Sequence, residues 1–141
     1  MREKIFWDTW AFLALADTKY RYHQQAKDVK AQLEHQHTVL ITTHAIMTEL
    51  GNAVSKIPKR SIAKEQMESL QEMIETKRGE MIPVSDLLWQ RAWELYHSRP
   101  DKEWGHTDCI SFVVMRELGI GKAFTNDHHF EQAGFTILVK T

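Results

Sequence analysis

The sequence has little of several features that define common classes of protein. Its 141 residues include one cysteine, three prolines and six glycines, which excludes a disulfide-rich scaffold, a proline-rich linker and a collagen-like repeat. The longest apolar run, residues 10–16, has seven residues, and the chain starts with polar residues, so we expect neither a membrane span nor a signal peptide. One cysteine beside six methionines is typical of a reducing compartment, which predicts a cytoplasmic protein.

An excess of charge of one sign is also lacking. Eighteen Lys and Arg residues oppose nineteen Asp and Glu residues, for a formal net charge of -1. No global positive field therefore marks a nucleic-acid binder, and a polyanionic partner would have to be held by local patches. Residues of the hydrophobic types make up 43% of the chain and charged ones 26%, which is typical of a soluble globular protein. We predict a single domain over residues 1–141.

Short apolar runs alternate with amphipathic stretches along the chain. We predict strands at residues 3–8, 38–42, 81–84, 123–125 and 135–139. Helices are predicted at residues 9–16, 20–36, 44–57, 62–78, 85–96 and 107–118. Residues 44–78 form a helical arm interrupted at Pro58, and Pro83 favours an edge position for the third strand. The alternation indicates an α/β fold with a parallel sheet covered on both faces.

Four acidic residues fall where ligands gather in such a fold, at the carboxyl ends of the strands. Asp8 ends the first strand, Asp127 follows the fourth, Asp108 lies in the first turn of an apolar helix, and Glu49 follows Thr43 by about one turn. Two carboxylates about 5 Å apart repel by roughly 3 kcal/mol at an effective dielectric constant near 20. A hard divalent cation such as Mg²⁺ or Mn²⁺ would remove this repulsion. Taken alone, each acid is more simply explained as a helix cap or a partner of the helix dipole, and it is their common location that favours a metal site.

Four sequence blocks resemble those of PIN-domain ribonucleases, and among these the VapC-like toxins. The blocks are DTWAFL at 8–13, TTHAIMTEL at 42–50, TDCISF at 107–112 and TNDHHF at 125–130. They occur in the order and with the spacings of that family and cover essentially the whole chain. The resemblance implies a three-layer α/β/α fold around a central parallel sheet, and Mg²⁺- or Mn²⁺-dependent cleavage of single-stranded or loop RNA. It also implies a small antitoxin protein as partner and a homodimer.

The resemblance assigns roles to six residues. The acidic quartet that would bind metal and catalyse hydrolysis corresponds to Asp8, Glu49, Asp108 and Asp127. Thr107 and Thr125 match hydroxyl positions that support the site. The sequence departs from the family pattern at His106, where similar chains often carry an apolar residue such as leucine. If its ring faces the cleft, we expect an altered metal preference or pH response.

Other candidate residues carry weaker signals. Lys102 and Lys122 are candidates for binding RNA phosphates, although a solvated lysine is the simpler interpretation. We expect Cys109 to be a core thiol and Trp104 to lie near the cleft. The helical stripe of three aromatic residues is interpreted as core, and the paired histidines as surface loop residues without zinc-binding spacing. These two sets are Trp89, Trp93 and Tyr96, and His35, His37, His128 and His129.

The leading interpretation is a metal-dependent endoribonuclease that acts as the toxin of a toxin–antitoxin pair. Two alternatives stay open at this point. The first is a nuclease-inactive PIN-like fold that serves as a protein-binding module, although a dead site has no reason to retain four clustered acids. The second is a housekeeping RNA-processing nuclease with the same chemistry, which composition does not separate from a toxin.

Overall fold

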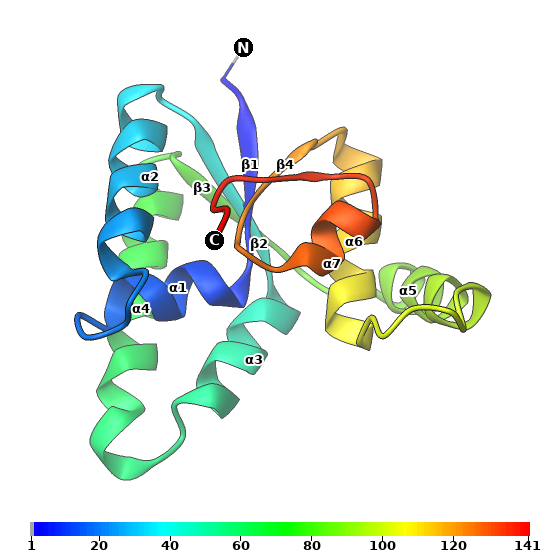
Figure 1. Cartoon of the computed structure of the whole chain (residues 1–141), viewed down its shortest axis with the longest axis horizontal. Coiled ribbons are helices and arrows are strands. Elements are labelled where there is room, and N and C mark those ends of the chain that lie inside the picture. Colours follow the sequence, from blue (N-terminus) through cyan, green and yellow to red (C-terminus); the bar gives the residue numbers. More distant parts are fainter. Residues whose placement is uncertain (1) are drawn as a thin grey trace.

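The computed structural model describes residues 2–141 and contains a five-stranded parallel sheet (Figure 1). The strand order is β3-β2-β1-β4-β5, and every neighbouring pair is parallel. The strands, in chain order, are β1 (Lys4–Trp7), β2 (Val39–Thr43), β3 (Gly79–Ile82), β4 (Lys122–Phe124) and β5 (Thr136–Ile137). The α/β class and the parallel sheet predicted from the sequence are thus confirmed.

Seven α-helices and one 3-10 turn connect these strands. The helices are α1 (Thr9–Ala16), α2 (His23–His35), α3 (His44–Ala53), α4 (Arg60–Glu75), α5 (Asp86–Ser98), α6 (His106–Leu118) and α7 (His128–Gln132), with η1 (Ile57–Lys59) between α3 and α4. Figure 1 shows α1, α2 and α4 on one side of the sheet and α6 and α7 on the other, which is the expected three-layer arrangement. Among residues 2–141, no helix has the length and apolarity that a membrane crossing requires.

The central strands are buried because helices cover both of their faces. Ile5, Phe6 and Ile41 are fully buried, as continuous apolar runs in parallel sheets should be. β3 lies at the edge of the sheet, as Pro83 suggested, but begins and ends two residues earlier than predicted. Because Pro83 has no N–H to donate, the ladder stops at Ile82, directly before it.

The helix α6 forms the centre of one layer. Seven consecutive residues, 109–115, are buried, and Gly119 ends the helix in the left-handed conformation (φ 68°). Cys109 is among the buried residues, so the expectation of a core thiol is confirmed. Burial raises the pKa of this thiol to about 11, which keeps it protonated and unreactive at neutral pH.

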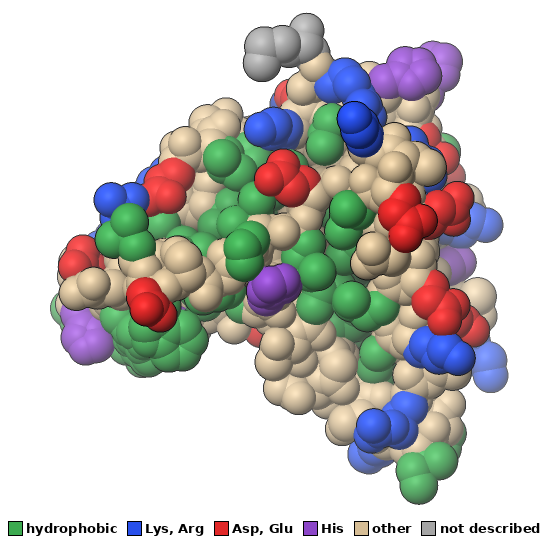
Figure 2. Space-filling model, turned by 180° about the vertical axis from the view of Figure 1, so that it is seen from behind, with side chains coloured by type: hydrophobic (Ala, Val, Ile, Leu, Met, Phe, Trp, Pro, Cys, Tyr) green, Lys and Arg blue, Asp and Glu red, His purple; other side chains and the backbone are tan. Residues whose placement is uncertain are grey.

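The helical arm projects from the carboxyl end of the sheet (Figure 1). It consists of α3, the turn η1 and the first part of α4. At its tip Ile57 is 87% exposed. The space-filling view shows lysine and arginine side chains gathered toward the end of the arm (Figure 2). The sequence places Lys56, Lys59 and Arg60 here, and all three are exposed. The tip of the arm therefore presents an exposed apolar side chain beside basic ones.

The helix α5 corrects one prediction. Its aromatic stripe was interpreted as core, but Trp89 and Tyr96 are 51% and 43% exposed and Trp93 is half-buried. The helix instead buries Leu88 and Ala92, a stripe adjacent to the aromatic one. It packs mainly against α6 and projects from the body of the domain (Figure 1), so only one narrow face is covered.

Candidate active site

The four predicted acids are contributed by four different connections at the carboxyl end of the sheet. Asp8 directly follows β1, and Glu49 lies in α3, which begins immediately after β2. Asp108 lies in the first turn of α6, and Asp127 precedes α7. Figure 1 shows α3 and the start of α6 on either side of the edge where β1 and β2 end. The side chains thus come from segments far apart in sequence that share one edge of the fold.

Asp8 is the most buried of the four acids, with 6% of its surface exposed. Its Oδ2 atom accepts a hydrogen bond of 2.8 Å from the Thr125 hydroxyl. Although Asp8 precedes α1, within residues 2–141 its side chain makes no capping hydrogen bond to that helix. Burial raises the pKa of Asp8 to about 7, against the lowering effect of Thr125, and the charges of Asp108 and Glu49 add to the rise.

Asp108 and Asp127 form the second part of the site together with a histidine. The Nδ1 atom of His129 lies 3.4 Å from Asp108 Oδ2 and 3.5 Å from Asp127 Oδ1. One potential ligand atom from each of the three residues lies within 4.8 Å of the others. Burial is the main reason that the pKa of Asp108 is raised, and the charges of Asp127 and Glu49 contribute. Asp108 is thus coupled electrostatically to Asp8 and to Glu49, the two acids outside this trio.

Both acids of this trio also cap helices. Asp108 Oδ2 accepts a hydrogen bond of 3.0 Å from the Gly105 N–H, and Asp127 Oδ1 accepts one of 2.9 Å from the His129 N–H. Both acids therefore do have the capping role that an acid at such a position can have without any metal. It does not exclude ligand binding, because each capping hydrogen bond engages one oxygen of its carboxylate, and the Asp8 side chain lies in the same cluster without capping α1.

Glu49 completes the cluster from the side of the arm. Its Oε1 atom accepts a short hydrogen bond from the Thr9 hydroxyl, which ties α3 to the first residue of α1. The carboxylate itself stays exposed to solvent. Since its charge acts on both Asp8 and Asp108, Glu49 faces the same space as the other acids. The structure therefore brings all four predicted acids to one site.

The two supporting threonines lie beside the acids. Thr125 is fully buried, and besides donating to Asp8 its Oγ1 atom accepts a hydrogen bond of 3.1 Å from the Asp127 N–H. Thr125 thus bridges two of the acids. Thr107 precedes Asp108 in the first turn of α6, and its carbonyl accepts a hydrogen bond from the Ser111 hydroxyl.

Of the two lysines proposed for substrate binding, Lys122 lies away from the acids. Lys122 begins β4, at the amino edge of the sheet, and pairs with Glu3 at 3.2 Å. This edge is opposite to the one at which the acids lie, because all strands run in the same direction. Lys102 lies in the loop before α6, and its amino group is 3.9 Å from Asp101. Both are engaged by neighbouring acids.

Two aromatic side chains that precede Asp108 in the sequence pack against other elements. The His106 ring stacks on Trp93 at 4.0 Å and meets Trp89 edge-on at 4.4 Å, so it packs against α5. Burial lowers the pKa of His106, and its Nε2 atom has no hydrogen-bond partner within residues 2–141. Trp104, expected near the cleft, is 3% exposed and donates to Gln132 in α7. It therefore anchors α7 to α6.

Sequence reasoning missed two contributors to the site, His129 and Thr9. His129 was interpreted as a surface loop residue, but α7 turns its ring toward the acids. The available signal was the position of His129 two residues after Asp127, because a side chain in the first turn of a helix can fold back toward the residue that caps the helix. Thr9 follows Asp8 directly and was not among the candidate residues.

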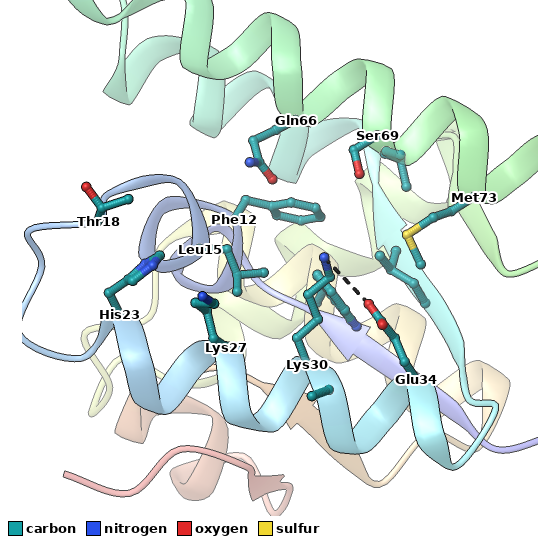
Figure 3. A pocket seen from close by; sticks show the side chains of 14 residues that line it. Phe12, Leu15, Thr18, His23, Lys27, Lys30, Glu34, Gln66, Ser69 and Met73 are labelled. Atoms are coloured by element: carbon teal, nitrogen blue, oxygen red, sulfur yellow. Dashed lines mark ion pairs between the residues drawn. The ribbon is translucent and has the colours of Figure 1, made fainter.

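A pocket elsewhere in the molecule carries different chemistry. It has a volume of about 500 Å³ and lies between α1, α2 and α4 (Figure 3). Phe12, Leu15 and Met73 line its wall, and Lys30 and Glu34 form an ion pair of 3.5 Å at its edge. Within the described chain, none of the four acids lines this pocket. The acid cluster is thus a separate site.

The donor set of the cluster fits a divalent cation. Carboxylate oxygens dominate it, as Mg²⁺ and Mn²⁺ prefer, and a single imidazole nitrogen is compatible with Mn²⁺. The raised pKa of buried Asp8 shows that the protein alone does not neutralise this carboxylate. A bound cation would do so. Asp108, Asp127 and His129 offer ligand atoms close enough together to hold it, and the charges of Asp8 and Asp108 act on each other from the same edge of the sheet.

Comparison with known proteins identifies the class to which this fold and site belong. The PIN domain model matches residues 5–136, and the chain therefore belongs to the PIN domain family. Two curated relatives, 23S rRNA-specific endonucleases VapC20 from two strains of Mycobacterium tuberculosis, are 40% identical over 48 residues. The aligned segment is 34% of this chain and only 37% of the length of each relative.

Solved structures extend the similarity to the whole chain. The crystal structure of Mycobacterium tuberculosis VapC20, a sarcin-ricin loop cleaving toxin, superposes with a TM-score of 0.78 and 25% identity. The match covers 94% of this chain and 96% of that one. VapBC2 from Rickettsia felis, bound to a promoter DNA fragment, has a TM-score of 0.64 at 14% identity over 95% of this chain and 96% of that one. At that identity the second match shows the fold alone.

Proposed function

We propose that this chain is a single-domain, metal-dependent endoribonuclease that acts as the toxin of a toxin–antitoxin pair. The observation that carries the proposal is the convergence of Asp8, Glu49, Asp108 and Asp127, with Asp8 buried and its pKa raised to about 7. Burying an acid among other acids costs stability unless the site has a cationic ligand. The RNA-cleaving activity named for the VapC20 relatives supports hydrolysis of RNA as the reaction.

The reaction is hydrolysis of a phosphodiester bond by water. A bond forms between the water oxygen and phosphorus, the bond from phosphorus to one ribose oxygen breaks, and that ribose oxygen gains a proton. A bound Mg²⁺ or Mn²⁺ supplies a water of lowered pKa and neutralises charge on the phosphate oxygens. We assign Asp8 and Asp108 to the principal ligand shell, and Glu49 and Asp127 to waters of that shell or to a second ion.

Two hydroxyl groups hold these carboxylates in place. The Thr125 hydroxyl donates to Asp8 and fixes the orientation of its carboxylate, while the Thr9 hydroxyl donates to Glu49. Each bond restricts the rotation of an acid before the metal arrives. Such preorganisation keeps the ligands within the few tenths of an ångström that octahedral coordination tolerates.

RNA has to approach a site that is itself acidic. The cations best placed for this are at the tip of the arm, where Lys56, Lys59 and Arg60 are exposed. The helix α3 connects this tip directly to the cleft, since it begins after β2 and carries Glu49. We therefore assign phosphate contacts to the arm tip in place of Lys102 and Lys122. Neutralising phosphates provides affinity without sequence preference.

The arm is also our proposed surface for protein partners. We propose that residues 44–78 contact a small antitoxin and a second copy of the chain in the cytoplasm. Ile57 at 87% exposure and Met67 at 36% are the apolar side chains such contacts would cover. The VapBC2 structure from Rickettsia felis, bound to a promoter DNA fragment, contains a chain of the same fold. An antitoxin on this surface would compete with RNA for the basic tip.

A cleavage assay with matched variants tests the proposed reaction. The purified chain should cut RNA in Mg²⁺ or Mn²⁺, and EDTA should abolish the cleavage. Asp108→Asn should abolish cleavage with the fold retained, whereas Asp101→Asn, at an exposed acid outside the cluster, should cleave at the wild-type rate. RNA that binds but is not cut in any divalent metal would favour the binding-module interpretation. Cleavage that persists in EDTA would contradict metal catalysis.

A further inference from the structure

Within residues 2–141, one ring nitrogen of the histidine beside the two capping acids is not hydrogen-bonded to any single partner. His129 Nδ1 lies 3.4 Å from Asp108 Oδ2 and 3.5 Å from Asp127 Oδ1, and the side chain is 22% exposed. Both distances exceed the 2.7–3.2 Å of an ordinary N–H···O hydrogen bond. The nitrogen therefore faces two carboxylates almost equally without bonding closely to either.

These separations are close to those between ligands of one ion. Two ligand atoms at adjacent corners of an octahedron with bonds of about 2.1 Å lie about 3 Å apart, and opposite corners lie about 4.2 Å apart. The three candidate atoms lie within 4.8 Å of one another. A contraction of up to about 0.6 Å, from 4.8 Å to the roughly 4.2 Å between opposite corners, would bring all three to one ion.

The backbone keeps the ring in this position. The His129 N–H donates to Asp127 Oδ1 at 2.9 Å, so the cap of α7 joins the histidine to one of the two acids. The next residue, Phe130, is fully buried and packs edge-on against Phe112 of α6, with ring centres 5.0 Å apart. Because α6 also carries Asp108, the packing of α7 on α6 holds the imidazole opposite that acid.

We infer that His129 supplies a nitrogen ligand to the divalent cation that Asp127 holds together with Asp108, the second ion of the assignment above, which gives the site a preference for Mn²⁺ over Mg²⁺. This inference rests on the proposed function, since it concerns the cation that serves the nuclease reaction. Imidazole nitrogen suits transition metals, whereas Mg²⁺ is bound mainly by oxygen. A site with oxygen ligands alone would show less of this preference.

The neighbouring residue provides a matched control. His128 is adjacent in sequence and exposed, and its ring centre lies 4.8 Å from that of His129. It is not part of the potential metal-binding group found among the described residues. A substitution at His128 therefore makes the same chemical change at the start of α7 without removing the proposed ligand.

Mn²⁺ binding and pulsed electron paramagnetic resonance test the assignment directly. The wild-type chain with bound Mn²⁺ should show hyperfine coupling to a directly bonded nitrogen, and ¹⁵N-histidine labelling should change that coupling. His129→Asn should lose it, bind Mn²⁺ about tenfold more weakly in calorimetry and keep its affinity for Mg²⁺ within about twofold. His128→Asn should retain both coupling and affinity. His129→Gln provides a second variant, and circular dichroism verifies the fold of each.

The outcomes separate this inference from the proposed function. Mn²⁺ binding that Asp108→Asn abolishes, but without nitrogen coupling, would overturn the role of His129 and leave the acidic metal site intact. Coupling that survives in both His129 variants would also overturn it. A wild-type chain that binds neither Mn²⁺ nor Mg²⁺ would overturn the metal site itself, and with it both proposals.

Discussion

Replacing Asp8 by asparagine should stabilise the metal-free protein. Asp8 is buried beside Asp108 and Glu49, and its pKa is raised from 3.8 to about 7. Asparagine has nearly the same shape, keeps an oxygen that can accept the Thr125 hydrogen bond, and carries no charge. Within residues 2–141 the Asp8 side chain does not cap α1, so no helix cap is lost. The substitution thus removes an electrostatic penalty with little else changed.

The sign and size of the effect follow from the two pKa values. Because the folded state holds the Asp8 proton more tightly than the unfolded state, stability falls as pH rises from about 4 to about 7 and stays low above that. Each factor of ten in proton affinity corresponds to about 1.4 kcal/mol, so the full penalty is about 4 kcal/mol. Asp8→Asn should therefore gain about 4 kcal/mol at pH 8 and about 2 kcal/mol at pH 5.

Urea unfolding in EDTA at the two pH values measures this difference. The midpoint for Asp8→Asn should exceed that of wild type by more at pH 8 than at pH 5, with unchanged dependence on urea concentration. Saturating Mn²⁺ should shrink this difference, because the wild-type site gains more of the ion's binding free energy than a site that has lost the Asp8 carboxylate. A variant that is less stable than wild type at pH 8, or a difference that does not depend on pH, would refute the reasoning and indicate a structural role for the carboxylate.

Three further results are expected. Changing Lys56, Lys59 and Arg60 together to glutamine should raise KM for RNA several-fold and leave the melting temperature within about 2 °C. The slope of log affinity against log salt should become shallower by up to about 2. An unchanged slope would remove the arm tip from the RNA interface. Thr9→Val should lower kcat by about tenfold with little effect on KM, because Glu49 loses the hydrogen bond that orients it; an unchanged kcat would show that this bond is incidental. Ca²⁺ should bind but suppress cleavage in competition with Mg²⁺, since it favours longer and looser coordination, and cleavage at full rate in Ca²⁺ would contradict the assigned geometry.

The sheet edge and its acids could be predicted because the relevant signals are local. A short apolar strand that ends in Asp8, and the β-branched run before Thr43, each define where a parallel strand ends. Parallel strands bring their carboxyl ends to one edge, so the positions of Asp8 and Asp127 follow from topology alone. The burial of α6 followed from its continuous apolar surface, which left no face for solvent.

The features that were missed depend on rotation about a helix axis or on packing between elements. The stripe at Trp89, Trp93 and Tyr96 has the same periodicity as the buried pair Leu88 and Ala92, and periodicity does not say which stripe meets the core. The direction of a side chain such as His129 depends in the same way on how a short helix docks. Without the surrounding structure, sequence patterns determine neither which stripe of a helix meets the core nor where a side chain on a short helix points.

The nucleophile in RNA cleavage tests the central claim most directly. Once the cut site is mapped, the assay uses an RNA with a single 2′-deoxy nucleotide on the 5′ side of the scissile phosphate. If water activated at the acid cluster attacks phosphorus, cleavage should continue at a similar rate and leave ends without a 2′,3′-cyclic phosphate. Loss of cleavage in the deoxy substrate, with cyclic phosphate ends on the unmodified RNA, would show that the 2′-hydroxyl attacks and would contradict metal-dependent hydrolysis at this site.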